Sequence, residues 1–273
     1  VNVKVLGAGA NIQTALRIEY GLAGVVETTC TFEDCDYFSV AMYRCVNCHA
    51  SPSTLRARAP DLSYGIGFLG GCYGCAADGG YGEDLRHYVT VGDNDGINVN
   101  CRATNNIVMF AREAGIDSHV ASFNFIAAHN QIQLASGLGD EGVTLQGLNG
   151  QAISNTVRGV SGTGILLQPL VTAPFKNKGV ARGNQIHLLD GVSATTQVGV
   201  FILSNVTNGG NWESADVDGN TIYGGAGSTA VIHVYVTVRS ANKQIKNVCI
   251  RGNVRVGDAA TRGVYIRGEV AGA

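Results

Sequence analysis

Two polar segments of the chain combine the residue types that acid–base chemistry on sugars requires. The first runs from Asp84 through Arg86 to His87, and the second contains Asp117 and His119. Histidine exchanges protons near neutral pH, and an aspartate can orient a histidine or serve as one of the two carboxylates of glycoside hydrolysis. Arginine binds carboxylates and phosphates through paired N–H groups. These segments therefore indicate a carbohydrate-handling surface.

Both segments have the period-two pattern of short strands, which decides the face on which each side chain lies. If the leucine and isoleucine of these segments point inward, then Arg86, Asp117 and His119 point outward. We expect Arg86 to lie within ion-pair reach of Asp117 on the next coil. In this alternation His87 points inward, unless a bend lies beside it.

The candidate catalytic residues are His119, Asp117 and His87, and the candidate substrate-binding residues are Arg86, Asp84, Glu113 and Gln146. A ladder of hydrogen bonds that only ties successive strands together is the alternative interpretation of these side chains. No metal site and no cofactor is predicted. Residues 92–96 have the composition of a calcium loop but lack the downstream glutamate of an EF-hand, so we interpret them as a tight turn.

A recurring pair of short motifs indicates which elements carry these side chains. Glycine followed by aliphatic residues marks one strand of each repeat, and asparagine, any residue and an aliphatic residue mark another. The asparagine motif begins at Asn130, Asn155, Asn184, Asn220 and Asn253, at intervals of 25, 29, 36 and 33 residues. Such irregular intervals are typical of a repeat in which one corner carries loops of variable length.

This pattern predicts an all-β fold, a parallel β-helix in which each coil stacks on the one before it. Glycine and asparagine would occupy the corners, because both tolerate a left-handed backbone, and the asparagines would form a ladder of amide hydrogen bonds. A β-sandwich, which also has many short strands, is the alternative. Residues 1–273 are predicted to form a single domain, and the two ends of the sequence lead us to expect a piece of a longer chain.

Seven of the eight cysteines lie between residues 30 and 101, which leaves three interpretations open. Cys45 and Cys48 form one Cys-x-x-Cys pair and Cys72 and Cys75 form another, and together they have the spacing of a four-cysteine zinc site. Small buried side chains at equivalent places in successive coils are favoured over this metal site. Disulfides are the third interpretation.

The composition excludes several classes of protein. Hydrophobic residues make up 45% of the chain and charged residues only 15%, so the chain is not disordered. The formal net charge is −2 and there is no basic cluster, so nucleic acid is not an expected partner. No apolar run reaches the roughly 18 residues of a membrane span, so membrane insertion is not expected.

The run from Asp84 to Thr90, followed about one coil later by the run from Gly115 to His119, resembles segments of a known family. They are similar to the paired Arg-His and Asp-x-His segments of pectate-lyase-like, right-handed β-helix proteins of phages and prophages, the tailspikes and tail-associated depolymerases. The glycine and asparagine coils over residues 96–260 resemble the same class. The resemblance implies the body of a homotrimeric spike, located on a virion tail assembled in the bacterial cytoplasm or otherwise extracellular.

The same resemblance implies a function. Members of this class bind, and usually cleave, a bacterial capsule or O-antigen polysaccharide, by hydrolysis or by elimination. We therefore expect a polysaccharide depolymerase that takes part in host recognition, either a glycoside hydrolase or a polysaccharide lyase. The calcium-binding aspartate cluster of pectate lyases is missing from the sequence, which argues against a calcium-dependent lyase. A glycan-binding or adhesion spike without catalysis and a structural tail solenoid are the alternatives.

Overall fold

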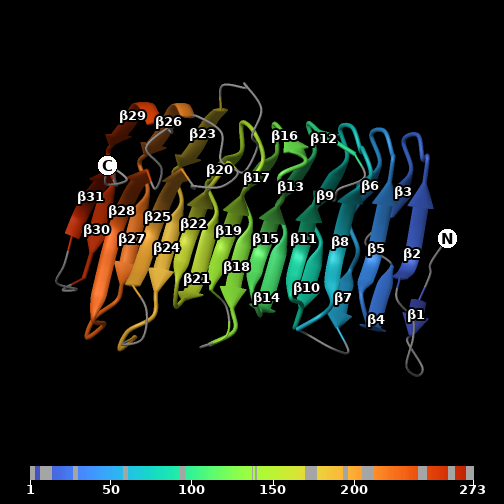
Figure 1. Cartoon of the computed structure of the whole chain (residues 1–273). Coiled ribbons are helices and arrows are strands. Elements are labelled where there is room, and N and C mark those ends of the chain that lie inside the picture. The colour runs from blue at the N-terminus through green and yellow to red at the C-terminus, as the bar shows by residue number, and fades with distance from the viewer. Residues whose placement is uncertain are drawn as a thin grey trace, which may run out of the picture.

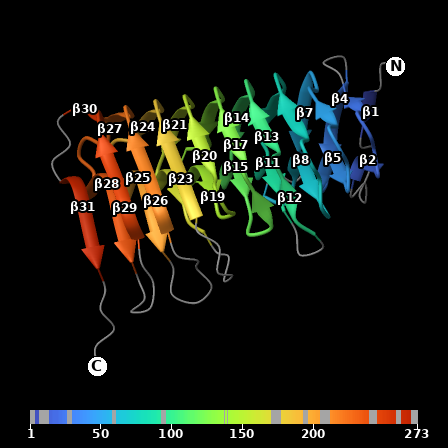
Figure 2. The ribbon, with the colours of Figure 1, turned by 90° about the horizontal axis from the view of Figure 1, so that it is seen from above.

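The structure is a computed structural model of the chain. It describes residues 4–6, 14–26, 30–57, 61–92, 96–136, 138, 140–169, 177–192, 196–204, 212–238, 245–257 and 262–268. Within these residues the chain winds as a right-handed parallel β-helix, whose coils stack along one axis from the N-terminus to the C-terminus (Figures 1 and 2). The described residues contain no helix, and therefore none that could span a membrane. The predicted fold class is confirmed, and the β-sandwich alternative is excluded.

Each described coil except the last contributes one strand to each of three long sheets, in the order sheet 1, sheet 2, sheet 3, and the last contributes to sheets 1 and 2. Sheet 1 contains β1 (Lys4–Leu6), β4 (Thr31–Cys35), β7 (Thr54–Ala57), β10 (Tyr81–Glu83), β14 (Ile107–Ala111), β18 (Gln131–Leu134), β21 (Thr156–Val160), β24 (Gln185–Leu188), β27 (Thr221–Gly224) and β30 (Val254–Val256). Sheet 2 contains β2 (Thr14–Glu19), β5 (Phe38–Tyr43), β8 (Tyr64–Leu69), β11 (His87–Val91), β15 (Ala114–Ser118), β19 (Glu141–Leu145), β22 (Thr163–Leu167), β25 (Thr196–Ser204), β28 (Ala230–Val238) and β31 (Arg262–Gly268).

Sheet 3 completes each coil, and a short pair of strands lies beside it. Sheet 3 contains β3 (Val25–Val26), β6 (His49–Ala50), β9 (Ala76–Asp78), β13 (Arg102–Thr104), β17 (Ile126–Ala128), β20 (Gln151–Ile153), β23 (Asn177–Arg182), β26 (Trp212–Asp218) and β29 (Ile245–Arg251). The short pair is β12 (Asn98–Val99) with β16 (Ser122–Phe123). Neighbouring strands of a sheet are therefore one coil apart in sequence, and their outward side chains form columns parallel to the axis.

One apolar core fills the interior of the β-helix, and it includes most of the cysteines. All eight cysteines are free, seven of them are buried, and Cys249 is exposed. Cys48, Cys75 and Cys101 occupy the same place, immediately before successive strands of sheet 3. Burial raises the pKa of the Cys45 thiol to about 12. The free, buried thiols in successive coils agree with the favoured interpretation. Among the described residues no three histidine, cysteine or acidic side chains are placed to hold a metal ion.

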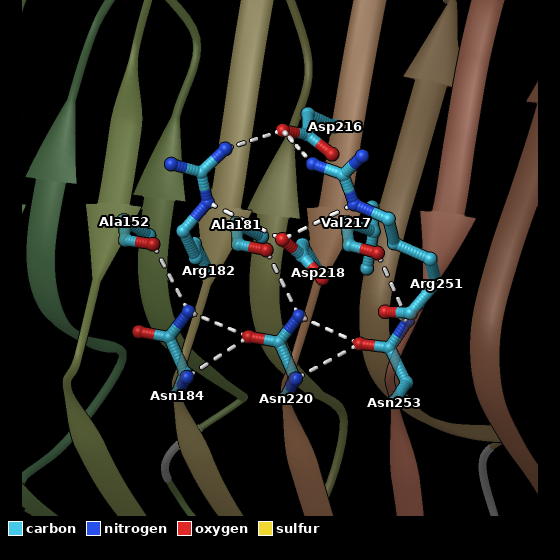
Figure 3. A network of polar contacts seen from close by, with 10 residues as sticks. All are labelled: Ala152, Ala181, Arg182, Asn184, Asp216, Val217, Asp218, Asn220, Arg251 and Asn253. Atoms are coloured by element: carbon cyan, nitrogen blue, oxygen red, sulfur yellow. Dashed lines mark hydrogen bonds and ion pairs between the residues drawn. The ribbon is translucent and has the colours of Figure 1, made fainter.

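Buried asparagines form a ladder along the corner that precedes sheet 1, as the sequence predicts (Figure 3). Asn184 donates from Nδ2 to the carbonyl of Ala152 at 3.0 Å and to Oδ1 of Asn220 at 2.8 Å. Asn220 repeats both bonds with Ala181 and Asn253. The earlier members of the ladder are Asn106, Asn130 and Asn155. Because each amide bonds the next coil, the ladder fixes the axial register of the strands that carry the candidate site.

The physical reason for the two motifs differs from the predicted one. The ladder asparagines do not have a left-handed backbone; the residue before each of them does, namely Asn105, His129, Ser154, Gly183, Gly219 and Gly252. The motif glycines are required by close packing instead. A Cβ on Gly115 would lie 2.5 Å from Cγ2 of Ile132, and one on Gly142 would lie 2.3 Å from Cγ1 of Val157. The prediction of left-handed corners at these positions is therefore wrong.

Two arginines and two aspartates form a network on the outer face of sheet 3, beside the asparagine ladder (Figure 3). Nη2 of Arg182 lies 2.6 Å from Oδ2 of Asp216, and Nε of Arg251 lies 3.2 Å from Oδ2 of Asp218. Each arginine also contacts the other aspartate, at 3.7 and 3.8 Å. Exposed ion pairs of this kind contribute little to stability, so the register depends mainly on the buried ladder and the core.

Candidate active site

The candidate site lies on the outer face of sheet 2, where three neighbouring strands, β11, β15 and β19, present polar side chains. Two outward columns run across these strands. One contains Thr90, Asp117 and Thr144, which are direct neighbours in the parallel register. The other contains His87 and Glu141, on either side of Ala114. The side chains of residues far apart in sequence are thereby held about 5 Å apart, the spacing of paired strands.

A bend in each strand turns His87 outward. Tyr88 and Val89 both lie in the core. On the next strand, Gly115 and Ile116 hold the equivalent two inward positions. Two successive inward positions break the alternation, so the residue before them faces outward. His87 therefore faces outward, because the bend that the sequence analysis allowed as an exception is present.

Asp117 and His119 form the centre of the cluster, as predicted. Oδ2 of Asp117 lies 2.8 Å from Nε2 of His119, and the side chain of His119 remains 44% exposed. Asp117 itself is 5% exposed. The hydrogen bond to Asp117 raises the pKa of His119, and a further side-chain hydrogen bond with Gln146 acts in the same direction. His119 is therefore held as an imidazolium to a higher pH than a histidine in water.

His87 has the opposite electrostatic character. Its side chain is 3% exposed, and burial lowers its pKa although Asp117 and Glu113 oppose this effect. Nδ1 lies 3.2 Å from the carbonyl of Ala114, which can only accept, so in neutral His87 the proton sits on Nδ1. The unprotonated Nε2 then faces the carboxylates of Asp117 and Glu113, each at 3.9 Å. His87 therefore stays neutral to a lower pH than a histidine in water.

Arg86 pairs with Glu113 and not with Asp117. Its Nε donates to Oε2 of Glu113 at 2.5 Å, and its Nη1 donates to the hydroxyl of Tyr64 at 2.9 Å. This hydrogen bond lowers the pKa of Glu113, which is therefore firmly ionised. The predicted ion pair between Arg86 and Asp117 is wrong, because the register sets Asp117 beside Thr90 instead.

The sequence reasoning missed Glu141, which lies next to the centre of the cluster. Its carboxylate accepts a hydrogen bond from the hydroxyl of Thr144, the residue directly beside Asp117 on the next strand. Burial raises the pKa of Glu141, and the negative charge of Asp117 adds to this effect. The glycine motif could have revealed it. Gly142 holds an inward position, so Glu141 immediately before it faces outward, just as His87 does before the inward Tyr88.

Two other features complete the description of the cluster. Asp84, a candidate substrate-binding residue, lies apart from it: Asp84 occupies a left-handed turn with φ of 52° and faces Arg112 at 3.9 Å.

Oδ1 of Asp117 and Oγ1 of Thr90 are buried with no hydrogen-bond partner among the described residues. Such unpaired acceptors are costly in a purely structural ladder, which favours a functional interpretation of Asp117. Residues 93–95 of the calcium-loop-like run lie outside the described residues.

Comparison with known proteins shows likeness at the level of structure. No protein-family model and no curated protein matches the sequence. The tailspike protein of Escherichia coli bacteriophage HK620, solved as a double mutant in complex with a pentasaccharide, superposes with a TM-score of 0.60 and 13% identity over 97% of this chain and 56% of that one. The tailspike protein gp49 of Pseudomonas phage LKA1 superposes with a TM-score of 0.58 and 14% identity over 89% of this chain and 46% of that one.

These likenesses establish that the chain has the right-handed parallel β-helix fold of phage tailspike proteins. The chain spans about half the length of the tailspikes that it matches, at 56% and 46%. The sequence resemblance to this class is thereby confirmed for the fold.

Proposed function

We propose that this chain is the β-helix body of a tailspike-type protein that binds and hydrolyses a bacterial surface polysaccharide, such as a capsule or an O-antigen. The fold that it shares with a tailspike solved in complex with a pentasaccharide supports glycan binding. The carrying observation for hydrolysis is the pair formed by Asp117 and Glu141 on neighbouring strands of the outer face of sheet 2. Virion-tail location and trimeric assembly, expected from the resemblance, belong to the same proposal.

The two carboxyl groups lie on neighbouring strands, which suits a pair that acts on one glycosidic bond. Glu141 bonds the hydroxyl of Thr144, and Thr144 lies one strand from Asp117 in the same column. Glu141 and Asp117 thus lie on adjacent strands, and the charge of Asp117 acts on Glu141. We take them as the closely spaced carboxyl pair of a retaining glycosidase. The raised pKa of Glu141 suits a general acid that donates its proton to the glycosidic oxygen.

Asp117 is suited to the second role. Its Oδ2 is fixed by His119, while Oδ1 has no partner among the described residues. Once substrate binding has uncovered this buried carboxylate, it would attack the anomeric carbon as the bond to the leaving oxygen breaks and Glu141 protonates that oxygen. In the second step Glu141, now ionised, takes a proton from water, and the water oxygen displaces Asp117. A raised pKa such as that of Glu141 is typical of the acid in such a pair.

The test is incubation with a panel of purified capsule and O-antigen polysaccharides, with polymer size and ultraviolet absorbance followed together. We expect polymer size to fall without new absorbance, and proton NMR to show retained anomeric configuration in the first product. Glu141→Gln and Asp117→Asn should each lower the rate by about a hundredfold or more. Glu33→Gln, a matched change on sheet 1, should leave it unchanged. New absorbance would indicate elimination instead, with His87 as the base, and would refute the assignment of roles.

One observation favours binding without cleavage as a second candidate function. Asp117 is 5% exposed, and a hollow on this face lies over β25, β28 and β31, away from the cluster. If binding is the whole function, Asp117→Asn and wild type should bind the same polysaccharide equally and neither should shorten it. Light scattering of the purified protein tests the trimer separately, since a trimer has three times the mass of the chain.

A further inference from the structure

A hollow of about 580 Å³ lies on the outer face of sheet 2, over β25, β28 and β31. One of its walls is the column of Phe201, Tyr235 and Tyr265. This column is the continuation of the one that contains Asp117, since Thr144 and Leu166 link the two in register. Phe201 lies three strands from Asp117, or about 14 Å along the axis. The hollow and the acid cluster therefore share one continuous face.

The wall of the hollow offers ring edges and hydroxyl groups. The ring centroids of Phe201 and Tyr235 are 4.7 Å apart with 5° between their planes, and those of Tyr235 and Tyr265 are 5.1 Å apart with 21° between them. Because these rings stack on one another, their edges border the hollow. Thr196 and Thr229, on successive coils, add two hydroxyl groups to the lining. Amphipathic edges and repeated hydroxyls suit a sugar chain that runs along the axis.

The charge of the lining is of one sign. Arg262 and Arg267 line the hollow, and among the residues that the structure describes no carboxylate does. Cζ of Arg262 lies 4.2 Å from the ring centroid of Tyr265, so the ring holds the guanidinium plane in place. A stacked guanidinium keeps its N–H groups at the edge of its plane, where they can bind a carboxylate with two hydrogen bonds.

The opposite end of the same sheet provides an internal comparison. There Cζ of Arg17 also lies 4.2 Å from a tyrosine ring centroid, that of Tyr43. Arg17, however, forms an ion pair with Glu19, and both residues line the small hollow at that end. The same arginine-on-tyrosine arrangement is thus neutralised at the N-terminal end, whereas no described carboxylate enters the lining of the larger hollow.

We propose that this hollow binds a carboxylate-bearing sugar, so that the polysaccharide held by the protein is an acidic one. Arg262 binds the carboxylate, and the ring edges and threonine hydroxyls contact the sugar ring. The inference rests on the proposed function in one respect: the polymer that fills the hollow is the one that reaches the acid cluster about three strands away.

The test uses oligosaccharides of glucuronate, galacturonate and mannuronate immobilised on an array beside their carboxyl-reduced forms. Asp117→Asn protein is applied, so that cleavage does not remove the probes. We expect binding to carboxylated oligosaccharides and at least about tenfold weaker binding to the reduced forms. Adding Arg262→Gln should lower the affinity by a similar factor, whereas adding Arg17→Gln, the matched control, should not change it.

The outcomes separate this inference from the proposed function. Absence of binding to every carboxylated oligosaccharide, equal binding to the reduced forms, or no effect of Arg262→Gln would each overturn the acidic-sugar site. Hydrolysis of a neutral polysaccharide, unaffected by Arg262→Gln, would also overturn it and leave the proposed hydrolysis intact. Uronate binding that depends on Arg262, in a wild-type protein that cleaves none of these polymers, would sustain the site and refute the hydrolysis.

Discussion

The Asp117–His119 pair makes a prediction that needs no substrate. Replacing Asp117 by Asn removes the hydrogen bond to a carboxylate that raises the pKa of His119. A hydrogen bond to a charged group contributes about 1.5–3 kcal/mol, and the 44% exposure of the His119 side chain reduces this through solvent screening. We take about 1–1.5 kcal/mol, and because one pKa unit corresponds to about 1.4 kcal/mol, the pKa of His119 should fall by roughly one unit.

The measurement is an NMR titration of the imidazole protons, which is simple because the chain has only 6 histidines. His119→Gln assigns the signal. Glu113→Gln is the control, because Glu113 contacts His87 and Arg86, and its loss should shift His87 but leave His119 close to its wild-type value. A fall of less than about 0.3 unit for His119 in Asp117→Asn would refute the charge-assisted hydrogen bond.

The same pair makes stability depend on pH with a defined sign. The folded pKa of His119 is raised, so its contribution is complete below the unfolded value of about 6.5 and is lost as pH rises through the folded pKa. The free energy of unfolding of the wild type, measured in urea, should therefore fall across that interval by about 1 kcal/mol more than that of Asp117→Asn. An equal pH dependence in the two proteins would contradict the assignment.

Four further predictions test the fold and the site. Asn184→Ala removes four ladder hydrogen bonds and should lower the free energy of unfolding by about 3–5 kcal/mol in urea, whereas the exposed neighbour change Gln185→Ala should cost less than about 0.5. Gly82→Ala should destabilise or abolish folding in thermal melts, because its Cβ would lie 2.1 Å from the ring of Tyr88. In native protein a thiol reagent should modify Cys249 alone, and the other cysteines should react only after unfolding. Thr144→Val should shift the alkaline limb of the pH–rate profile of hydrolysis to a pH about one unit higher, because it removes the hydrogen bond that lowers the pKa of Glu141.

The fold was predictable because its determinants recur in the sequence. The asparagines that begin each motif are the ones that form the ladder, and their spacing in the chain is the length of each coil. The reason given for them was wrong, since the left-handed residue is the one before each asparagine. A buried amide ladder and a left-handed corner both favour asparagine at recurring positions, and only the structure distinguishes the two causes.

The site was predictable only in part. Asp117 and His119 were placed together because they lie two residues apart, Asp117 near the end of β15 and His119 directly after it. The sequence could not place the side chains of Arg86, His87 and Glu141 in this way. Their positions depend on how neighbouring coils are aligned, and the strand alternation fails at the bend. Reading Gly115 and Gly142 as inward positions, which their contacts with the core require, would have placed His87 and Glu141 outward.

The bend links the packing of the β-helix to the chemistry of the candidate site. Because the glycine and the residue after it both face inward, the residue before the glycine and the one two positions after it share the outer face. On β19 these residues are Glu141 and Thr144, and the bend is what allows the hydroxyl to reach the carboxylate. In regular strand alternation residues three apart lie on opposite faces. Close packing at Gly142 therefore also turns Glu141 to the outer face, where the proposed hydrolysis needs its acid.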